Sequence, residues 1–122
     1  MWTKDWTRIE VNPQELIDAC RGRRAQAWGY VVSHAMFLVR FHEMQQDSDV
    51  YLLCKGCEEV SFLSGWPDAE LSLDIRRTGQ DGEVEITDGE RLRILCGWAF
   101  WTKSAQSDGF LHLDDSIKIS AD

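Results

Sequence analysis

The sequence predicts a mainly β protein, with α+β as the alternative class: an antiparallel sandwich or curled meander of about eight short strands, with one short N-terminal helix at about residues 13–21. One observation behind this prediction is that the dipeptide Asp-Gly occurs three times, at residues 81–82, 88–89 and 108–109, between stretches of alternating apolar and polar residues. Tight hairpin turns need positive φ angles, which Gly and, less readily, Asp adopt at low cost. The other observation is a clear helix-start pattern near the N-terminus.

The expected helix is defined by its first and last residues. Asn12 can accept a hydrogen bond from the free amides of a helix start, and Pro13 has its φ angle preset for the first helical position. Glu15 completes a capping-box arrangement, and Gly22 is a natural terminator. Between these ends, three apolar residues fall on one stripe at helical spacing: Leu16, Ile17 and Cys20. A helix this short is stable only when that stripe packs on another element.

The rest of the chain favours strands. Residues 27–43 are apolar enough for a helix, but their β-branched valines argue for two strands, or for one long strand broken near Ser33-His34. Residues 64–68 are expected to form a loop, because Pro67 removes an amide donor and restricts the residue before it. Further strands are expected where apolar and polar residues alternate, at 50–55, 57–63, 71–76, 84–86, 110–113 and 117–119.

Residues 92–101 are expected to form one central strand, because both of its faces are apolar and such a strand is covered twice. Trp98 in this strand and Trp28 earlier in the chain are therefore expected in the core. Either the helix or a neighbouring copy of the chain would cover the second face, so a homodimer is an open alternative.

Length and composition indicate which class of protein this is. The 122 residues are expected to form a single domain, 1–122, and residues 1–20 lack the uninterrupted apolar core of a secretory signal. The longest apolar run, residues 35–39, is far shorter than the roughly 18 residues of a membrane span. The protein is therefore expected in the cytoplasm, where its four cysteines would be thiols rather than disulfides.

Charge is unevenly distributed and favours a protein partner. The net charge is −8, and residues 43–90 hold thirteen acidic and three basic residues. Such a surface repels phosphate backbones, so nucleic acid is not expected as a partner. The leading hypothesis is a non-catalytic binding domain that faces a basic protein, with a nuclease toxin as one concrete example. The residues expected at that interface are Trp66, Asp68, Glu58 and Glu59.

Two simpler explanations stay open. The acidic residues would keep a β-rich protein soluble without binding anything. Trp66, which stands before Pro67 in a polar segment, would serve equally well as a lid folded back onto the core.

The segment Cys54-Lys55-Gly56-Cys57 has metal-ligand spacing. If Lys55-Gly56 forms a tight turn, the sulfurs of Cys54 and Cys57 converge as half of a tetrahedral zinc site. The other half has no counterpart in the sequence, and the strand-like residues after Cys57 offer no helix for a redox dithiol. The second hypothesis is therefore a zinc- or small-ligand-binding β domain, and its simpler alternative is a hairpin turn flanked by two small residues. No other cofactor is expected.

Histidines supply the third hypothesis, a small enzyme. His34, His42 or His112 would act as an acid–base group if folding brought it beside a carboxylate in a pocket. The sequence contains no nucleophile elbow, Walker loop, dinucleotide fingerprint or His-Glu-x-x-His motif. No catalytic residue is therefore assigned.

Overall fold

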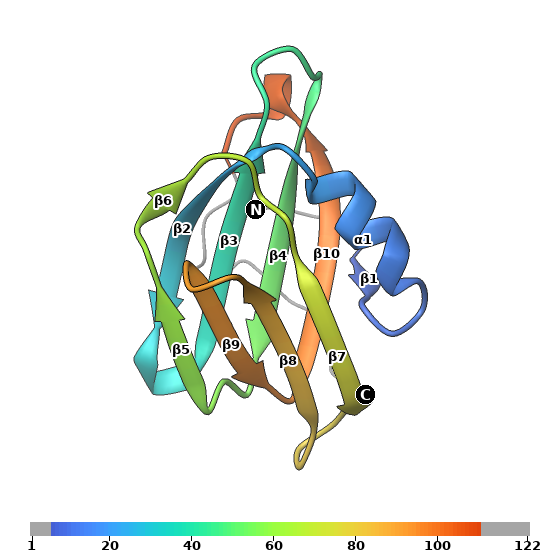
Figure 1. Ribbon diagram of the computed structural model, residues 1–122, viewed down its shortest axis with the longest axis vertical. Helices are drawn as coiled ribbons and strands as arrows, with labels where there is room; N and C mark the ends of the chain where they lie inside the picture. Colours follow the sequence, from blue (N-terminus) through green and yellow to red (C-terminus); the bar gives the residue numbers. More distant parts are fainter. Residues whose placement is uncertain (1–5, 111–122) are drawn as a thin grey trace.

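Two antiparallel sheets face each other in the computed structural model, which describes residues 6–110 (Figure 1). The six-stranded sheet has the order β1 (Thr7–Arg8), β10 (Trp98–Ala105), β4 (Ser48–Lys55), β3 (Met36–His42), β2 (Arg24–Val31), β6 (Gly65–Trp66). The four-stranded sheet has the order β5 (Glu59–Phe62), β9 (Leu92–Cys96), β8 (Glu83–Asp88), β7 (Ser72–Arg77). The predicted mainly β, antiparallel fold with one short helix is confirmed, with ten strands among the described residues.

The α-helix of the described residues, α1 (Pro13–Cys20), begins where the sequence predicts and ends one residue earlier than expected. Asn12 Oδ1 accepts a hydrogen bond from the Glu15 amide at 3.3 Å. Leu16 and Cys20 are fully buried, so the apolar stripe of α1 packs into the core between the sheets. No helix in this part of the chain is long and apolar enough to cross a bilayer.

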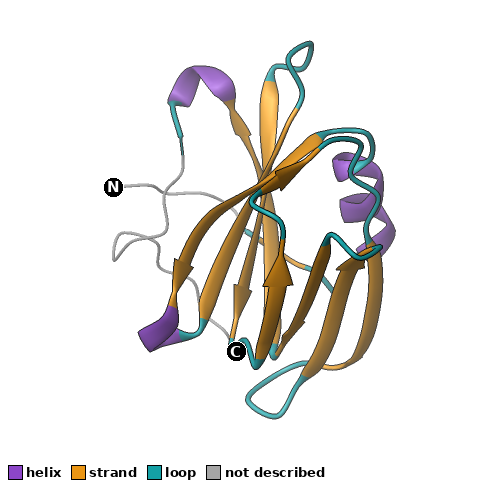
Figure 2. Cartoon of the chain, turned by 60° about the vertical axis from the view of Figure 1, so that its left-hand side comes forward, coloured by secondary structure: helices purple, strands orange, loops and turns teal. Residues whose placement is uncertain are grey.

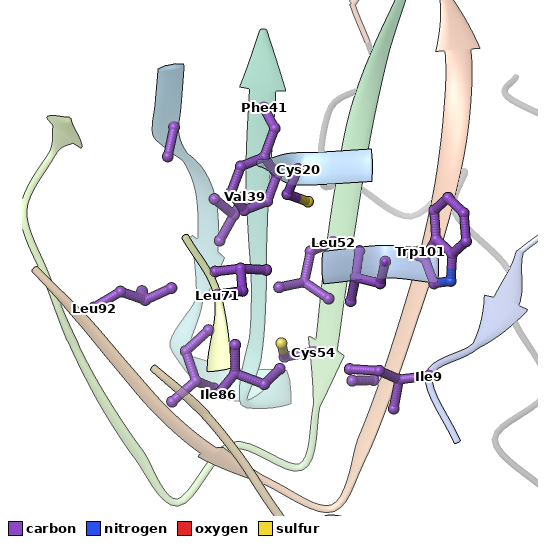
Figure 3. Close-up of a cluster of buried hydrophobic side chains, with 14 of the residues drawn as sticks. Ile9, Cys20, Val39, Phe41, Leu52, Cys54, Leu71, Ile86, Leu92 and Trp101 are labelled. Carbon is purple, nitrogen blue, oxygen red and sulfur yellow. The ribbon is translucent and has the colours of Figure 1, made fainter. Parts of the chain in front are cut away.

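The main core lies between the two sheets, and Figure 3 shows its centre. Its members come from both sheets and from α1, and those at the centre include Val39, Phe41, Leu52, Ile86, Leu92 and Cys20. A second, smaller cluster consists of Leu38, Tyr51 and Leu53, with Trp6 and Trp28 packed against it. Side chains alternate between the faces of a strand, so this cluster lies on the outer face of β3 and β4. β3 and β4 are therefore covered on both faces, and so is β10, where the consecutive residues 99–102 are all buried.

The prediction of one central strand at residues 92–101 is wrong. The chain forms β9 and β10 there, which belong to different sheets, and it crosses between them at Gly97. A Cβ atom at Gly97 would lie 2.4 Å from the carbonyl oxygen of Gly79, so only glycine lets the two backbones approach this closely. Trp28 and Trp98, which were expected in the core, are both half-buried.

The expected loop at residues 64–68 is partly a strand. β6 pairs with β2 in antiparallel register, with Trp66 opposite Ala25. Trp66 is only 2% exposed, and its Nε1 donates a hydrogen bond to Asp88 Oδ2 at 2.8 Å. The indole therefore belongs to the core, because its one polar atom finds a buried acceptor there.

The expected break near Ser33-His34 is confirmed, because the 3₁₀ turn η1 (Val32–His34) separates β2 from β3. Two of the Asp-Gly pairs lie in the predicted hairpins, one between β7 and β8 and one between β8 and β9. The third lies at the end of the 3₁₀ turn η2 (Gln106–Asp108). Apart from Phe110, the strands expected at 110–113 and 117–119 lie outside the described residues.

Candidate functional site

Exposed apolar side chains lie along one edge of the sandwich, which Figure 2 brings forward. We call this set the apolar edge; it consists of Tyr30, Val32, Phe62 and Leu63. Tyr30 lies in β2 of the six-stranded sheet, whereas Phe62 ends β5, the outermost strand of the four-stranded sheet. The apolar edge therefore spans both sheets.

A buried ring joins the two sides of the apolar edge. Phe37 of β3 meets Tyr30 edge-on, with 5.8 Å between the ring centroids, and it meets Phe62 at 4.7 Å. Phe37 is 1% exposed, but Tyr30 and Phe62 remain 47% and 39% exposed. Their positions are fixed by the core while part of each ring faces solvent, which is typical of aromatic anchors at protein interfaces.

Backbone groups are also open at this edge. β2 pairs with β6 only at Ala25 and Gln26, so the Tyr30 end of β2 has no outer strand partner among residues 6–110. β5 pairs with β9 on one side, and the described residues provide no strand on its other side. The Leu63 amide donates to the Arg91 carbonyl. Because backbone groups alternate in direction along a strand, those of Phe62 point away from β9.

The predicted carboxylates are exposed, and two of them lie at the start of β5. Glu58 and Glu59 are exposed at its start, and Glu59 pairs with Arg93. Asp68 is exposed in the segment after β6, where its carbonyl accepts a hydrogen bond from Arg91 at 3.2 Å. Neither Glu58 nor Asp68 forms an ion pair with another described residue. Three of the four residues predicted to face a partner are thus exposed, and two of them, Glu58 and Glu59, lie at β5.

The fourth, Trp66, does not lie there, and its expected role at an interface is corrected. Its side chain is enclosed between the sheets and bonded to Asp88, so it has no surface to offer a partner. The alternative of a tryptophan folded back onto the core describes it better. The exposed aromatic anchors are Tyr30 and Phe62, which the sequence analysis missed.

Arginines neutralise much of the acidic segment. Seven of the thirteen acidic residues at 43–90 form ion pairs within the described part of the chain: Asp49, Glu59, Glu70, Asp74, Glu83, Glu85 and Asp88. Several partners come from outside that segment, namely Arg21, Arg40, Arg91 and Arg93. The net charge of the segment therefore overstates the acidity of the folded surface.

In place of the expected tight turn at Lys55-Gly56, Lys55 ends β4 and the chain bends at Gly56, while the Cys57 amide donates to the Ala35 carbonyl at 3.0 Å. This bend lies close to a third thiol. The Gly97 amide lies 3.2 Å from both the Lys55 and the Gly56 carbonyl oxygens, which places the neighbouring Cys96 beside the bend. A hydrogen bond with Cys96, together with burial, raises the pKa of Cys57. All four cysteines are free thiols.

The search for a metal site among the described residues gives one result. Within residues 6–110, no group of three or more Cys, His, Asp and Glu side chains is arranged to hold a metal ion. The alternative of a hairpin turn at Cys54 and Cys57 is wrong, because the segment connects β4 of the six-stranded sheet to β5 of the four-stranded sheet, and these two strands do not pair.

His42 is placed beside a carboxylate. Its Nδ1 lies 2.7 Å from Asp49 Oδ1, and Arg40 Nε donates to Asp49 Oδ2 at 3.0 Å. The Arg40 guanidinium is enclosed by two rings, with its central carbon 4.9 Å from the centroid of Trp28 and 4.7 Å from that of Phe110. The same His42 nitrogen also lies 3.1 Å from a terminal nitrogen of Arg40 and 3.3 Å from Gln106 Nε2.

The buried hydroxyl of Ser104 is not placed to act as a nucleophile with this histidine–carboxylate pair. Ser104 is buried on β10 opposite Asp49, but β4 separates it from His42 on β3. Two strand spacings amount to about 10 Å, which is too far for direct proton transfer. His34 is exposed in η1, where its Nδ1 contacts the Ser33 hydroxyl at 3.2 Å, and His112 lies outside the described residues.

Comparison of the chain with protein-family models, curated proteins and solved structures gave no match. Its function therefore has to be inferred from the geometry of the described residues.

Proposed function

We propose that this protein is a non-catalytic binding domain that receives a protein partner on its apolar edge. The observation that carries the proposal is the arrangement of Tyr30 and Phe62 on the buried ring of Phe37. Exposed aromatic surface contributes little to folding stability, but anchored rings contribute strongly when a partner covers them.

The partner suited to this surface is an extended segment that adds a strand to β5. Main-chain hydrogen bonds would form with the outward-facing backbone of Phe62, and apolar side chains would cover the rings. A basic side chain of the partner would reach Glu58, whose carboxylate no described residue neutralises. Neutralisation of a basic protein, such as a nuclease toxin, is a narrower form of this proposal, in which the net charge of −8 attracts the partner from a distance.

We also propose a cellular compartment for the protein, and we name one alternative to a different protein as the partner. Free thiols agree with the reducing cytoplasm, where we place the protein. The rival occupant is a second copy of the chain, which would pair β5 with β5 in a two-fold arrangement.

Affinity capture from host-cell extract tests the proposal. We expect the wild-type chain to retain a partner that Phe62→Ser loses, and the retained amount to fall as salt is raised from about 50 to about 500 mM. Val11→Ser is the matched control, because Val11 is a 71% exposed apolar residue that does not belong to the apolar edge. Leu63→Asp is a second variant, used in case loss of the Phe62–Phe37 contact destabilises the fold.

Each result has a defined meaning. Equal retention by wild type and both edge variants would show that the interface lies elsewhere. Capture of copies of the chain alone would replace the partner with a homodimer, and capture of nothing at low salt would contradict the proposal.

A further inference from the structure

A polar hollow of about 300 Å³ is lined by residues that follow or end α1, by the turn between β3 and β4, and by β10. Figure 1 shows these three segments at the same end of the molecule. The polar side chains of its wall are Arg21, Arg23, Lys103, Asp18, Glu43 and Gln46. None of these residues belongs to the apolar edge. The hollow is therefore separate from the proposed protein interface.

Arg23 is a buried cation in the wall of this hollow. The residue is 7% exposed, its Nε donates to the Ala19 carbonyl at 2.9 Å, and one terminal nitrogen donates to the Ser48 carbonyl at 2.6 Å. It forms no ion pair with any carboxylate of the described residues. Two neutral carbonyls satisfy part of the guanidinium, but they leave its full positive charge without a counterion.

Neighbouring groups cancel only part of this charge. Lys103 of β10 is exposed and forms no ion pair with any residue between 6 and 110. Of the two carboxylates in the wall, Asp18 is paired with Arg21 at 2.9 Å, whereas Glu43 has no ion-pair partner among the described residues. Three cations against two carboxylates leave the wall with a net charge of +1, and the cations that no carboxylate pairs with are Arg23, which follows α1, and Lys103 of β10.

We propose that the hollow binds a small phosphate-bearing ligand, whose oxyanion is held by Arg23 and Lys103. The remaining N–H groups of the guanidinium form a planar set of donors, and the ammonium adds a mobile point charge. A tetrahedral oxyanion has enough acceptor oxygens to bind both. The hollow has the volume of a small-molecule site at the lower end of the usual range. Glu43 and Gln46 would bind hydroxyl or ammonium groups on the rest of the ligand.

An NMR titration of the ¹⁵N-labelled chain with inorganic phosphate, at constant ionic strength in chloride, tests this site. We expect saturable shifts at the amides of Gly22, Arg23 and Lys103. Lys103→Gln should weaken binding about tenfold, as expected for the loss of one charge-assisted contact. Because Lys103 is exposed, this variant keeps the fold even if Arg23→Gln does not.

Arg93→Gln is the control, because it removes the same charge from the outer face of the four-stranded sheet, where Arg93 pairs with Glu59 and Glu85. It should leave the phosphate affinity within about twofold of wild type, since salt screens distant charges. Shifts that do not saturate, or equal weakening by both variants, would overturn the proposal. Partner capture by Lys103→Gln should equal that of wild type, which separates this site from the apolar edge.

Discussion

The indole nitrogen of Trp66 donates a hydrogen bond of 2.8 Å to Oδ2 of Asp88 inside the sandwich. The same oxygen accepts from the Glu70 amide at 3.0 Å, while Oδ1 of Asp88 pairs with Arg91 at 2.7 Å. One buried carboxylate therefore joins β6 of one sheet, the segment that enters β7, and the turn between β8 and β9.

Asp88→Ala should lower the free energy of unfolding by about 3–5 kcal/mol, because it leaves the Trp66 and Arg91 donors without their buried acceptor. Urea denaturation measures this loss. Glu90→Ala is the control: Glu90 is exposed two residues away, and its removal should change stability by no more than about 0.5 kcal/mol. A loss below about 1 kcal/mol for Asp88→Ala would contradict the role given to this carboxylate.

Gly97→Ala should destabilise the protein by about 3 kcal/mol, at the upper end of overpacking effects. The new Cβ would lie 2.4 Å from the Gly79 carbonyl oxygen, a backbone atom that cannot move aside as a flexible side chain can. Gly22→Ala provides the comparison, because Gly22 has a φ angle of +79° and no atom near its missing Cβ. It should lose only about 1–2 kcal/mol, from backbone strain. Thermal or urea unfolding that reverses this order would contradict the close packing at Gly97.

Local signals predicted the parts of the fold that depend on neighbours in sequence. The capping residue Asn12 and the Asp-Gly turns at 81–82 and 88–89 act over a few residues, so they could be recognised directly. The crossing at Gly97 could not, because apolar alternation continues through it and the reason for glycine is the distant Gly79 carbonyl. Trp66 was assigned to a loop because its partner, Asp88, is likewise remote in sequence.

The same limit applies to the candidate site. Charge alone indicated that Glu58 and Glu59 would be exposed, and they are. Tyr30 and Phe62 lie in apolar runs that look like core, and only the folded edge reveals that their rings stay open. One signal was available: Phe62 and Leu63 are consecutive, and consecutive residues of a strand cannot both face the core.

Arg40→Gln should cost about 3–5 kcal/mol of stability, because it leaves the Asp49 carboxylate, which is 2% exposed, without its paired cation. The variant also loses the cation–π contacts of the guanidinium with Trp28 and Phe110. Arg93→Gln removes the same charge from an exposed pair with Glu59, where salt and water screen the interaction, so its denaturation midpoint should stay close to that of wild type. Equal midpoints for the two variants would show that burial does not matter at Arg40.

Raised thiol pKa values predict that stability falls at alkaline pH. Burial raises the pKa of Cys20, and a hydrogen bond with Cys96 together with burial raises that of Cys57. Below about pH 8.5, the pKa of an unfolded cysteine, both states keep the proton and the stabilising contribution is complete. At higher pH the unfolded chain loses the proton while the folded protein keeps it, so each such thiol lowers the free energy of unfolding by up to about 1.4 kcal/mol per pH unit. Urea denaturation between about pH 7.5 and about pH 10, under reducing conditions, should show this decline, and Cys20→Ala should make it shallower. A Cys20→Ala protein whose stability declines as steeply as that of wild type would contradict the contribution of this buried thiol.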